Sequence, residues 1–365
     1  MRFLRLPATT AAVCLLAGYS LLCIAATVVA EEAIRHTTAK SEQPPRKVIV
    51  GTSMLNLYGR YPGLDERLTQ LEKHIDQAAA QAEQQYPGRG LDLFVLPENA
   101  VTLGRASDAR ERGIPLEGEV LDRLGAKAKQ YNTYLVLTLD RIDPESSDVF
   151  NSAVLVDRQG QPVGMYDKVY PVCAVGDQDL EGGIAPGTEF PVFDCDFGKV
   201  GMQICFDYNF EAGWNELARK GAEIVAVPTA TPQTVRPAAY AMRGNYYVVT
   251  STFRTNASIY NPIGMPHART TDEPVLIQEI DLAYATLHWS SNLHEGRTLK
   301  ERFGDDVGFV YYRSEDTGVF WSNNPDKPIG DMIRELDLYE MPQMVEYNRR
   351  LQDELRGGAP TPGGE

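Results

Sequence analysis

The sequence predicts an α/β fold in which amphipathic helices cover the faces of buried sheets. Short apolar runs rich in Val, Ile and Leu recur along the chain, as is typical of strands buried on both faces. Segments with apolar residues at helical spacing separate several of these runs. With 365 residues, 43% of them hydrophobic, the chain can form one large domain or two modest ones, and no repeat period is visible.

The first elements are expected close to Lys47, where the folded part should begin. The segment KVIVGTSML is a strand candidate, and the next segment predicts a helix because Leu68, Leu71 and Ile75 recur at helical spacing. The apolar run LDLFVLPE predicts a buried strand that stops at Pro97, because proline has no N–H for a sheet hydrogen bond.

The middle of the chain repeats this alternation. One helix is expected near residues 117–130, a second should end at Gly221, and a third should begin at Pro237. The remaining strand candidates are, in chain order, YLVLTLDRI, NSAVLVD, QPVGMYDKV, KVGMQIC, EIVAVPTA, YYVVTSTF and PVLIQEIDL. Strands that alternate with helices in this way indicate a layered α/β architecture.

Residues 1–30 resemble an export signal. Arg2 and Arg5 precede an uncharged run at residues 11–30, whose Val-Val-Ala ending suits a signal peptidase. Cleavage after Ala30 would leave 33 of the 35 basic residues against 50 acidic ones, so the net charge would change from −15 to −17. The uncharged run is also long enough to span a bilayer, so an uncleaved anchor is the alternative. We expect the folded part to be exported, either periplasmic or secreted, or to be tethered to a membrane through this run.

The rest of the chain is expected to divide into three parts. Residues 31–46 mix charge, Thr and Pro without apolar periodicity and are expected to form a linker. The main domain is expected at residues 47–294. Residues 295–365 are more polar, contain the helix-like segment PQMVEYNRRLQDELR, and end in a loose tail rich in Gly and Pro. We expect this C-terminal extension to pack on the main domain or on a partner subunit.

Composition excludes several classes of function. The net charge of −15 argues against a nucleic-acid-binding protein, which usually presents a basic face. No pair of His or Cys residues has the spacing of metal ligands, so we expect no metal and no cofactor. Without the leader, three cysteines remain at Cys173, Cys195 and Cys205, and an odd number leaves at least one unpaired. A disulfide between Cys173 and Cys195 stays open at this point.

Cys205, in the segment GMQICFDYNF, lies where an apolar strand should end. Loops at strand ends form the crevice of α/β sheets, although a free cysteine is also among the most frequently buried residues. A nucleophilic thiol needs a base and a group that stabilises the oxyanion. None of the five histidines lies obviously at a strand end, so a Cys-His hydrolase has little support. The histidines are His36, His74, His267, His288 and His294.

Two other charged residues do occupy strand ends. Glu98 follows the run LFVLP, and Lys168 stands just before Pro171 in the segment GMYDKVYP. Each taken alone is consistent with an ordinary surface charge. Together with Cys205 they form a complementary set, because a carboxylate can accept the thiol proton and an ammonium can stabilise a developing negative charge.

These segments resemble the carbon-nitrogen hydrolase, or nitrilase, superfamily. Its pattern is a Glu in a PE pair, a Lys in Y-x-K, and a Cys in G-x-x-I-C-[YFW]-[DE]. Here LPENA, YDKVYP and GMQICFD match that pattern in the same order, and the resemblance extends over roughly residues 47–282. It implies a four-layer αββα sandwich, and it implies a homo-oligomer because members commonly pair across a dimer interface.

The resemblance also implies the roles of individual residues. Glu98 would be the base, and Lys168 would hold the oxyanion together with the backbone N–H of Phe206. A second glutamate is implied between the lysine and the cysteine, and Glu181 in DLEGGIAPG matches it best.

The substrate is less well defined by the sequence. True nitrilases usually have Trp and Glu after the cysteine, so CFD favours the amidase and carbamoyl-hydrolase branches. The candidates for substrate binding are Phe206, Tyr208, Asn209 and Arg243, with Trp214 as a further pocket or core residue. A structural ion pair is the alternative for Arg243.

The sequence as a whole predicts thiol-dependent hydrolysis of a C–N bond in a small linear amide or N-carbamoyl compound. An N-acyltransferase with the same Glu-Lys-Cys site is the first alternative. A catalytically silent binding or scaffold protein of the same fold is the second, although such a protein would be free to lose one of the three residues.

Overall fold

The computed structural model describes residues 37–357, so the expected leader at residues 1–30 lies outside the described part of the chain. The chain forms two compact units. The larger unit comprises Pro45–Ala283, and the smaller combines residues 37–44 with residues 284–357. Between residues 37 and 357, no helix is both long and apolar enough to cross a membrane.

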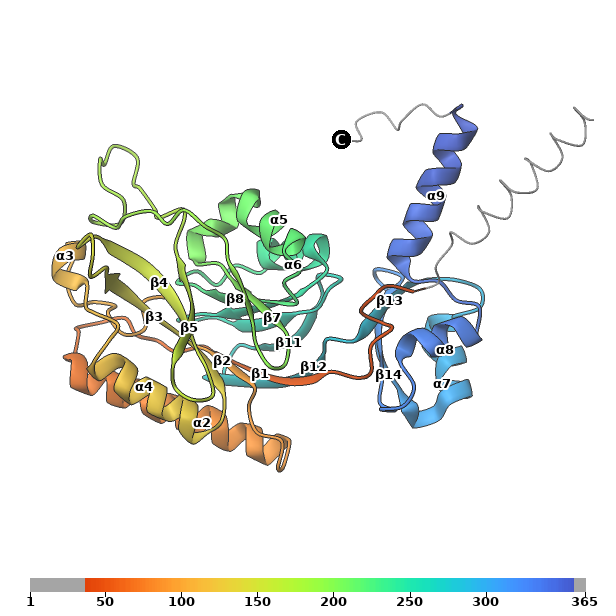
Figure 1. The fold of residues 1–365 in the computed structure, drawn as a ribbon, viewed down its shortest axis with the longest axis horizontal. Helices are drawn as coiled ribbons and strands as arrows, with labels where there is room; N and C mark the ends of the chain where they lie inside the picture. Colours follow the sequence, from red (N-terminus) through yellow and green to blue (C-terminus); the bar gives the residue numbers. More distant parts are fainter. Residues whose placement is uncertain (1–36, 358–365) are drawn as a thin grey trace, which may run out of the picture. The chain divides into compact units, whose positions relative to one another are not determined.

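The first sheet of the larger unit has six strands (Figure 1). Their order is β12 (Val275–Asp281), β1 (Lys47–Ser53), β2 (Leu93–Val95), β3 (Tyr134–Ile142), β4 (Val149–Val156) and β5 (Pro162–Asp167). β1, β2 and β3 are parallel, whereas β4 runs antiparallel to both β3 and β5. The C-terminal ends of β2, β3 and β5 therefore share one edge with the start of β4.

The second sheet also has six strands and a similar mixed pattern. Their order is β11 (Pro266–Thr270), β10 (Ala257–Tyr260), β9 (Tyr247–Ser251), β8 (Ile224–Pro228), β7 (Lys199–Met202) and β6 (Val192–Asp194). β7, β8 and β9 are parallel, which brings the loops after β7 and β8 to the same edge.

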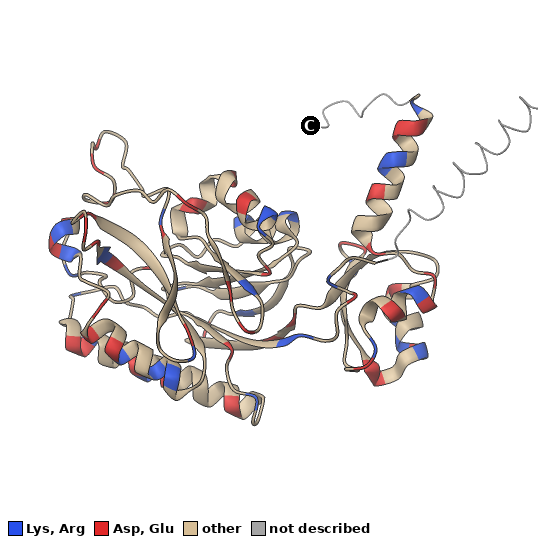
Figure 2. Ribbon diagram, in the orientation of Figure 1, with Lys and Arg blue, Asp and Glu red and all other residues tan. Residues whose placement is uncertain are grey.

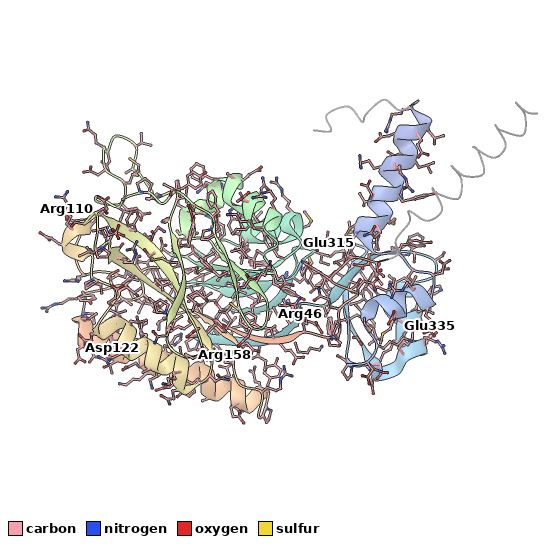
Figure 3. The ribbon with its side chains drawn as sticks, viewed as in Figure 1. Arg46, Arg110, Asp122, Arg158, Glu315 and Glu335 are labelled. Atoms are coloured by element: carbon pink, nitrogen blue, oxygen red, sulfur yellow. The ribbon has the colours of Figure 1, made fainter. Side chains whose placement is uncertain are left out.

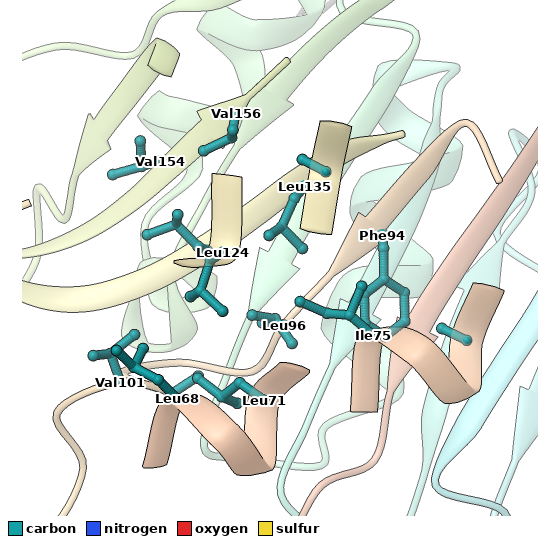
Figure 4. Packing of buried hydrophobic residues seen from close by; sticks show 14 of the residues in the cluster. Leu68, Leu71, Ile75, Phe94, Leu96, Val101, Leu124, Leu135, Val154 and Val156 are labelled. Carbon is teal, nitrogen blue, oxygen red and sulfur yellow. The ribbon is translucent and has the colours of Figure 1, made fainter. Parts of the chain in front are cut away.

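Two helices cover the outer face of the first sheet. α2 (Leu64–Gln85) and α4 (Glu119–Gln130) pack on it through an apolar cluster that includes Leu68, Leu124 and Phe94 (Figure 4). On each helix, the apolar side chains at helical spacing lie on the face that packs against the sheet. Burial of each such side chain stabilises the fold by roughly 1.5–3 kcal/mol.

Two further helices cover the second sheet, and the two sheets pack against each other. α5 (Glu211–Arg219) and α6 (Val235–Gly244) lie over the second sheet through the cluster around Trp214. Between the sheets, Thr52 Oγ1 donates to the Thr250 carbonyl at 2.7 Å. The four-layer αββα sandwich expected from the resemblance is confirmed.

The smaller unit has its own sheet and core. β15 (Thr317–Ser322) lies between β13 (Tyr284–His288) and β14 (Val307–Tyr312). The helical elements are η2 (His294–Gly296), α7 (Arg297–Phe303), η3 (Gly304–Asp306), α8 (Ile329–Glu335) and α9 (Met341–Leu355). Charges of both signs alternate along α9, which has no buried residue (Figure 2).

The unit boundary differs from the one expected at residues 294 and 295. It falls between Ala283 and Tyr284, because β13 pairs with β15 and not with either large sheet. Residues 37–44 are also not a free linker in the structure, since Thr38 N donates to Glu340 Oε1 at 2.6 Å within the smaller unit.

Candidate active site

Polar and charged side chains from three strands meet at one edge of the first sheet. Glu98 lies three residues beyond β2, and Lys168 follows the last residue of β5. Asn151 lies near the start of β4, and its carbonyl accepts a hydrogen bond from Lys168 N at 2.9 Å. The strand directions described above bring these residues together although 70 positions separate Glu98 from Lys168.

Lys168 lies between two carboxylates. Its Nζ donates to Glu98 Oε1 at 2.9 Å and to Glu181 Oε1 at 2.6 Å. The Lys168 side chain is only 1% exposed. A buried ammonium of this kind is costly unless it is paired, and here two carboxylates pair it.

The two carboxylates are held by further donors. Asn151 Nδ2 donates to Glu98 Oε1 at 2.9 Å and to Glu181 Oε2 at 3.3 Å. The backbone N–H of Ala230, from the loop after β8, donates to Glu98 Oε2 at 2.9 Å. Val172 N donates to Glu181 Oε1 at 2.9 Å. These contacts fix both carboxylates on either side of the ammonium.

Cys205 comes from the second sheet, three residues after β7, at the start of the 3₁₀ turn η1 (Cys205–Asn209). Its φ of 45° lies in the left-handed region, which a non-glycine residue rarely adopts. Asp207 holds the turn by accepting hydrogen bonds from Ile204 N at 2.7 Å and Tyr166 Oη at 2.8 Å. Such strained residues cluster at functional sites because the surrounding structure must hold them in place.

A cavity of about 350 Å³ joins these groups. It is lined by Glu98, Asn99, Leu103, Gly104, Ala106, Arg112, Lys168, Val172, Glu181, Cys205, Ala230 and Phe253. The structure therefore brings all four residues expected to be catalytic to one cavity. A larger cavity of about 490 Å³ in the smaller unit is lined by aromatic residues such as Trp289 and Tyr347 and contains none of the four.

Burial and neighbouring charges shift the pKa values of Glu98, Lys168 and Cys205. Burial alone would raise the pKa of Glu98, but the Lys168 ammonium and hydrogen bonds from Lys168, Asn151 and Cys205 lower it overall. Burial opposes the charge on Lys168, yet Glu98 and Glu181 raise the pKa of the ammonium. Burial and the Glu98 carboxylate raise the pKa of Cys205 to about 12. The resting site thus holds an ionised base beside a protonated thiol.

The four residues predicted to bind substrate do not line this cavity. Tyr208 is buried in the core cluster around Trp214, and the exposed Asn209 donates from its side chain to the Phe206 carbonyl at 2.9 Å. Arg243 forms an exposed ion pair with Glu211 at 2.8 Å, which is the structural alternative considered above. Nearness to Cys205 in sequence does not bring the Tyr208 and Asn209 side chains to the cavity, because from the tight turn they lie in the core and at the surface, respectively.

Trp214 is a core residue, and Cys173 and Cys195 are not joined by a disulfide. Trp214 is 1% exposed and stacks between Tyr208 and Tyr240, as expected for a core residue. Cys173 and Cys195 are both free thiols, so the structure does not contain the disulfide that the sequence left open. Within residues 37–357, no group of three or more His, Cys, Asp or Glu side chains is arranged to hold a metal ion.

Sequence reasoning missed three polar residues of the site. Asn151 is the third residue of β4, Asp207 anchors the turn at Cys205, and Arg112 lines the cavity from α3 (Ala109–Arg112). A polar residue at the start of the apolar strand NSAVLVD was the one available signal for Asn151. Arg112 had no such signal, because its position depends on the packing of a short helix.

Comparison with known proteins identifies the family. The carbon-nitrogen hydrolase family model matches residues 55–287, more than half of the chain, so the chain belongs to the carbon-nitrogen hydrolase family. A deaminated glutathione amidase of Yersinia enterocolitica is 32% identical over 178 residues, covering 45% of this chain and 57% of that protein. A bifunctional nitrilase/nitrile hydratase of Lupinus angustifolius is 25% identical over 267 residues, covering 67% of this chain and 75% of that protein.

Solved structures agree with the fold. Nit3 of Saccharomyces cerevisiae, a member of branch 10 of the nitrilase superfamily, aligns with a TM-score of 0.55 at 20% identity. The alignment covers 65% of this chain and 90% of that chain. A protein named as an amidase is among these relatives, in agreement with the branch expected from the sequence.

Proposed function

We propose that this chain hydrolyses a C–N bond in a small linear amide or N-carbamoyl compound through a Cys205 thioester. The observation that supports the proposal is the convergence of Glu98, Lys168 and Cys205 on one cavity. An ionised carboxylate beside a protonated thiol is the starting state that a base-assisted attack requires.

The first half of the reaction forms the thioester. Glu98 takes the Cys205 proton as the sulfur attacks the amide carbon, and the carbonyl π electrons move to oxygen. The Lys168 ammonium stabilises this oxyanion, together with the Phe206 backbone N–H that the family resemblance implies. When the intermediate collapses, the C–N bond breaks and the departing nitrogen takes the proton from Glu98, which releases ammonia or an amine.

The second half restores the enzyme. Water attacks the thioester carbon as Glu98 takes one of its protons, and a second oxyanion forms at the same donors. Collapse of this intermediate breaks the C–S bond, and the sulfur recovers the proton from Glu98. The sum is amide plus water giving a carboxylic acid plus ammonia or an amine.

The test is ammonia release by the purified protein from aliphatic amides, N-carbamoyl amino acids and nitriles. Release that disappears in Cys205→Ala, with the circular dichroism spectrum retained, would establish the thiol hydrolase and show which compound class it accepts. Release from nitriles alone would contradict the amidase assignment. A folded protein that releases no ammonia from these compounds, but transfers the acyl group of an ester or thioester donor to hydroxylamine with release of the alcohol or thiol, would support acyl transfer instead.

We also propose that the chain is exported, on the basis of the charge and apolar pattern of residues 1–30. Fractionation of expressing cells, with the N-terminus of the mature protein sequenced, distinguishes cleavage after Ala30 from an uncleaved anchor. Recovery of the intact chain from the cytoplasm would contradict export.

A further inference from the structure

A second ion pair lies beside the cavity and has no part in the reaction described above. Arg112 Nε donates to Asp140 Oδ2 at 2.7 Å. The Asp140 side chain is fully buried in β3, and the Arg112 side chain is 12% exposed. Asp140 pairs in register with Asn151, the residue that donates to both Glu98 and Glu181. The ion pair is therefore adjacent to the network of the candidate site.

The other N–H groups of Arg112 bind backbone carbonyls. Nη2 donates to the Glu181 carbonyl at 3.0 Å, and Nη1 donates to the Ser107 carbonyl at 2.9 Å. Arg112 thus links buried Asp140 to the segment that presents the Glu181 carboxylate. The planar guanidinium suits this task, because its donors diverge in fixed directions.

The backbone at Glu181 requires such support. Its φ is 46°, in the left-handed region, and the next residue, Gly182, has a φ of 75°. The Gly182 carbonyl accepts a hydrogen bond from Ala109 N at 2.8 Å. A Cβ at Gly182 would lie 2.3 Å from the Ser107 carbonyl oxygen, so the two segments are in close contact. A strained residue keeps its conformation only when its surroundings hold it there.

We propose that Arg112, held by Asp140, is a positioning residue that keeps the Glu181 carboxylate against Lys168 and so controls the reactivity of Cys205. The inference rests on the proposed function, since it assigns Glu181 and Lys168 to activation of the thiol. If the Glu181 carboxylate is displaced, the Lys168 ammonium loses one of its two carboxylate partners and its fixed place beside the oxyanion. Misplacement by about 1 Å can cost on the order of 10²-fold in rate.

The substitution Arg112→Lys tests the donor geometry of Arg112 separately from its charge. Lysine keeps the positive charge near Asp140, but a single ammonium does not reproduce the divergent donors that reach Asp140, Ser107 and Glu181. The matched control is Arg110→Lys, two residues earlier in α3, where the side chain is exposed and points away from the fold (Figure 3).

The experiment measures alkylation of Cys205 by iodoacetamide, with the site assigned by peptide mass spectrometry. We expect Arg112→Lys and Glu181→Gln each to slow alkylation about 10-fold or more, and Arg110→Lys to leave it unchanged. Because Arg112 acts through Glu181, the double variant should be no more than about twofold slower than Glu181→Gln. Effects that multiply in the double variant would overturn the proposal.

The melting temperature and the steady-state kinetics of Arg112→Lys distinguish failure of this proposal from failure of the proposed function. If Arg112→Lys lowers the melting temperature but alkylation of the folded protein is unchanged, the residue is merely structural and the proposal is wrong. Alkylation needs no hydrolysable substrate, so this result is independent of whether any amide is cleaved. Once a substrate is found, Arg112→Lys should lower kcat with little change in KM, whereas a rise in KM alone would contradict a positioning role.

Discussion

The two sheets of the larger unit supply different kinds of group to one cavity. The first sheet provides Glu98, Asn151 and Lys168, which form a charged hydrogen-bonded network. The second provides the Cys205 thiol after β7 and the Ala230 backbone N–H after β8. Neither sheet alone has both a nucleophile and the groups that activate it, so the site exists only where the two sheets pack together.

The part of the site on the first sheet (the first half) and the part on the second sheet (the second half) are also held in place by different interactions. Charge pairing holds the first half, where Lys168 is buried between two carboxylates. The second half is held by the hydrogen bonds to Asp207 and by the stacked rings around Trp214. Substitutions in the first half should therefore leave uncompensated charge, whereas substitutions in the second should leave gaps and lost hydrogen bonds.

The largest combined effect on stability and activity is expected from Lys168→Met, which removes the cation of the first half. Glu98 and Glu181 would remain buried without it, so we expect the free energy of unfolding to fall by about 3–5 kcal/mol. Loss of the oxyanion donor should lower ammonia release on the order of 10²- to 10³-fold or more. Urea unfolding and the ammonia assay measure both quantities. If adding Glu181→Gln recovers no stability, charge pairing does not hold this half.

Glu98→Gln should come next, with a loss of about 10²- to 10⁴-fold in kcat because the base is gone. In the wild type, Lys168 and the hydrogen bonds lower the pKa of Glu98 below its ordinary value of 4.5. The carboxylate therefore stays ionised as the pH falls to that value, and the activity and stability that depend on its ionisation are lost only below it. A profile of kcat/KM against pH, at pH values where the protein stays folded, tests this. An acid limb near neutral pH that Glu98 controls would contradict it.

Trp214→Phe tests the second half and should have a smaller effect. It removes the Nε1–H that donates to the Asp207 carbonyl at 3.1 Å and leaves a smaller ring against Tyr240. We expect the free energy of unfolding to fall by about 1–2 kcal/mol and kcat to change less than about tenfold. A loss of stability as large as that of Lys168→Met would erase the contrast between the two halves.

Arg243→Gln should have the smallest effect. Arg243 and Glu211 form an exposed ion pair, and neither lines the cavity. The KM and the melting temperature should stay within the error of the measurements, since exposed pairs contribute little. A clear rise in KM would restore the assignment to substrate binding that the sequence suggested.

Sequence patterns were sufficient to predict most helices and strands of the larger unit. The helical spacing of Leu68 and Leu71 predicted α2, and the apolar run YLVLTLDRI coincides with β3. The same patterns did not predict the strands of the smaller unit, which are short and lie in a more polar stretch. Strand pairing and the packing of α8 bring Leu287, Phe320 and Ile333 into one core, and no local periodicity predicts such contacts.

The sequence by itself determined the family and the candidate residues Glu98, Lys168 and Cys205, because each follows a short strand in a local motif. Only the tertiary structure decided which polar groups surround them. Asn151 reaches Glu98 across 53 positions, and Arg112 reaches Glu181 across 69, through strand pairing and the packing of a short helix. It also placed Tyr208 in the core cluster around Trp214 and Arg243 in an exposed ion pair with Glu211, since the surroundings of a side chain depend on the folded backbone and not on sequence position alone.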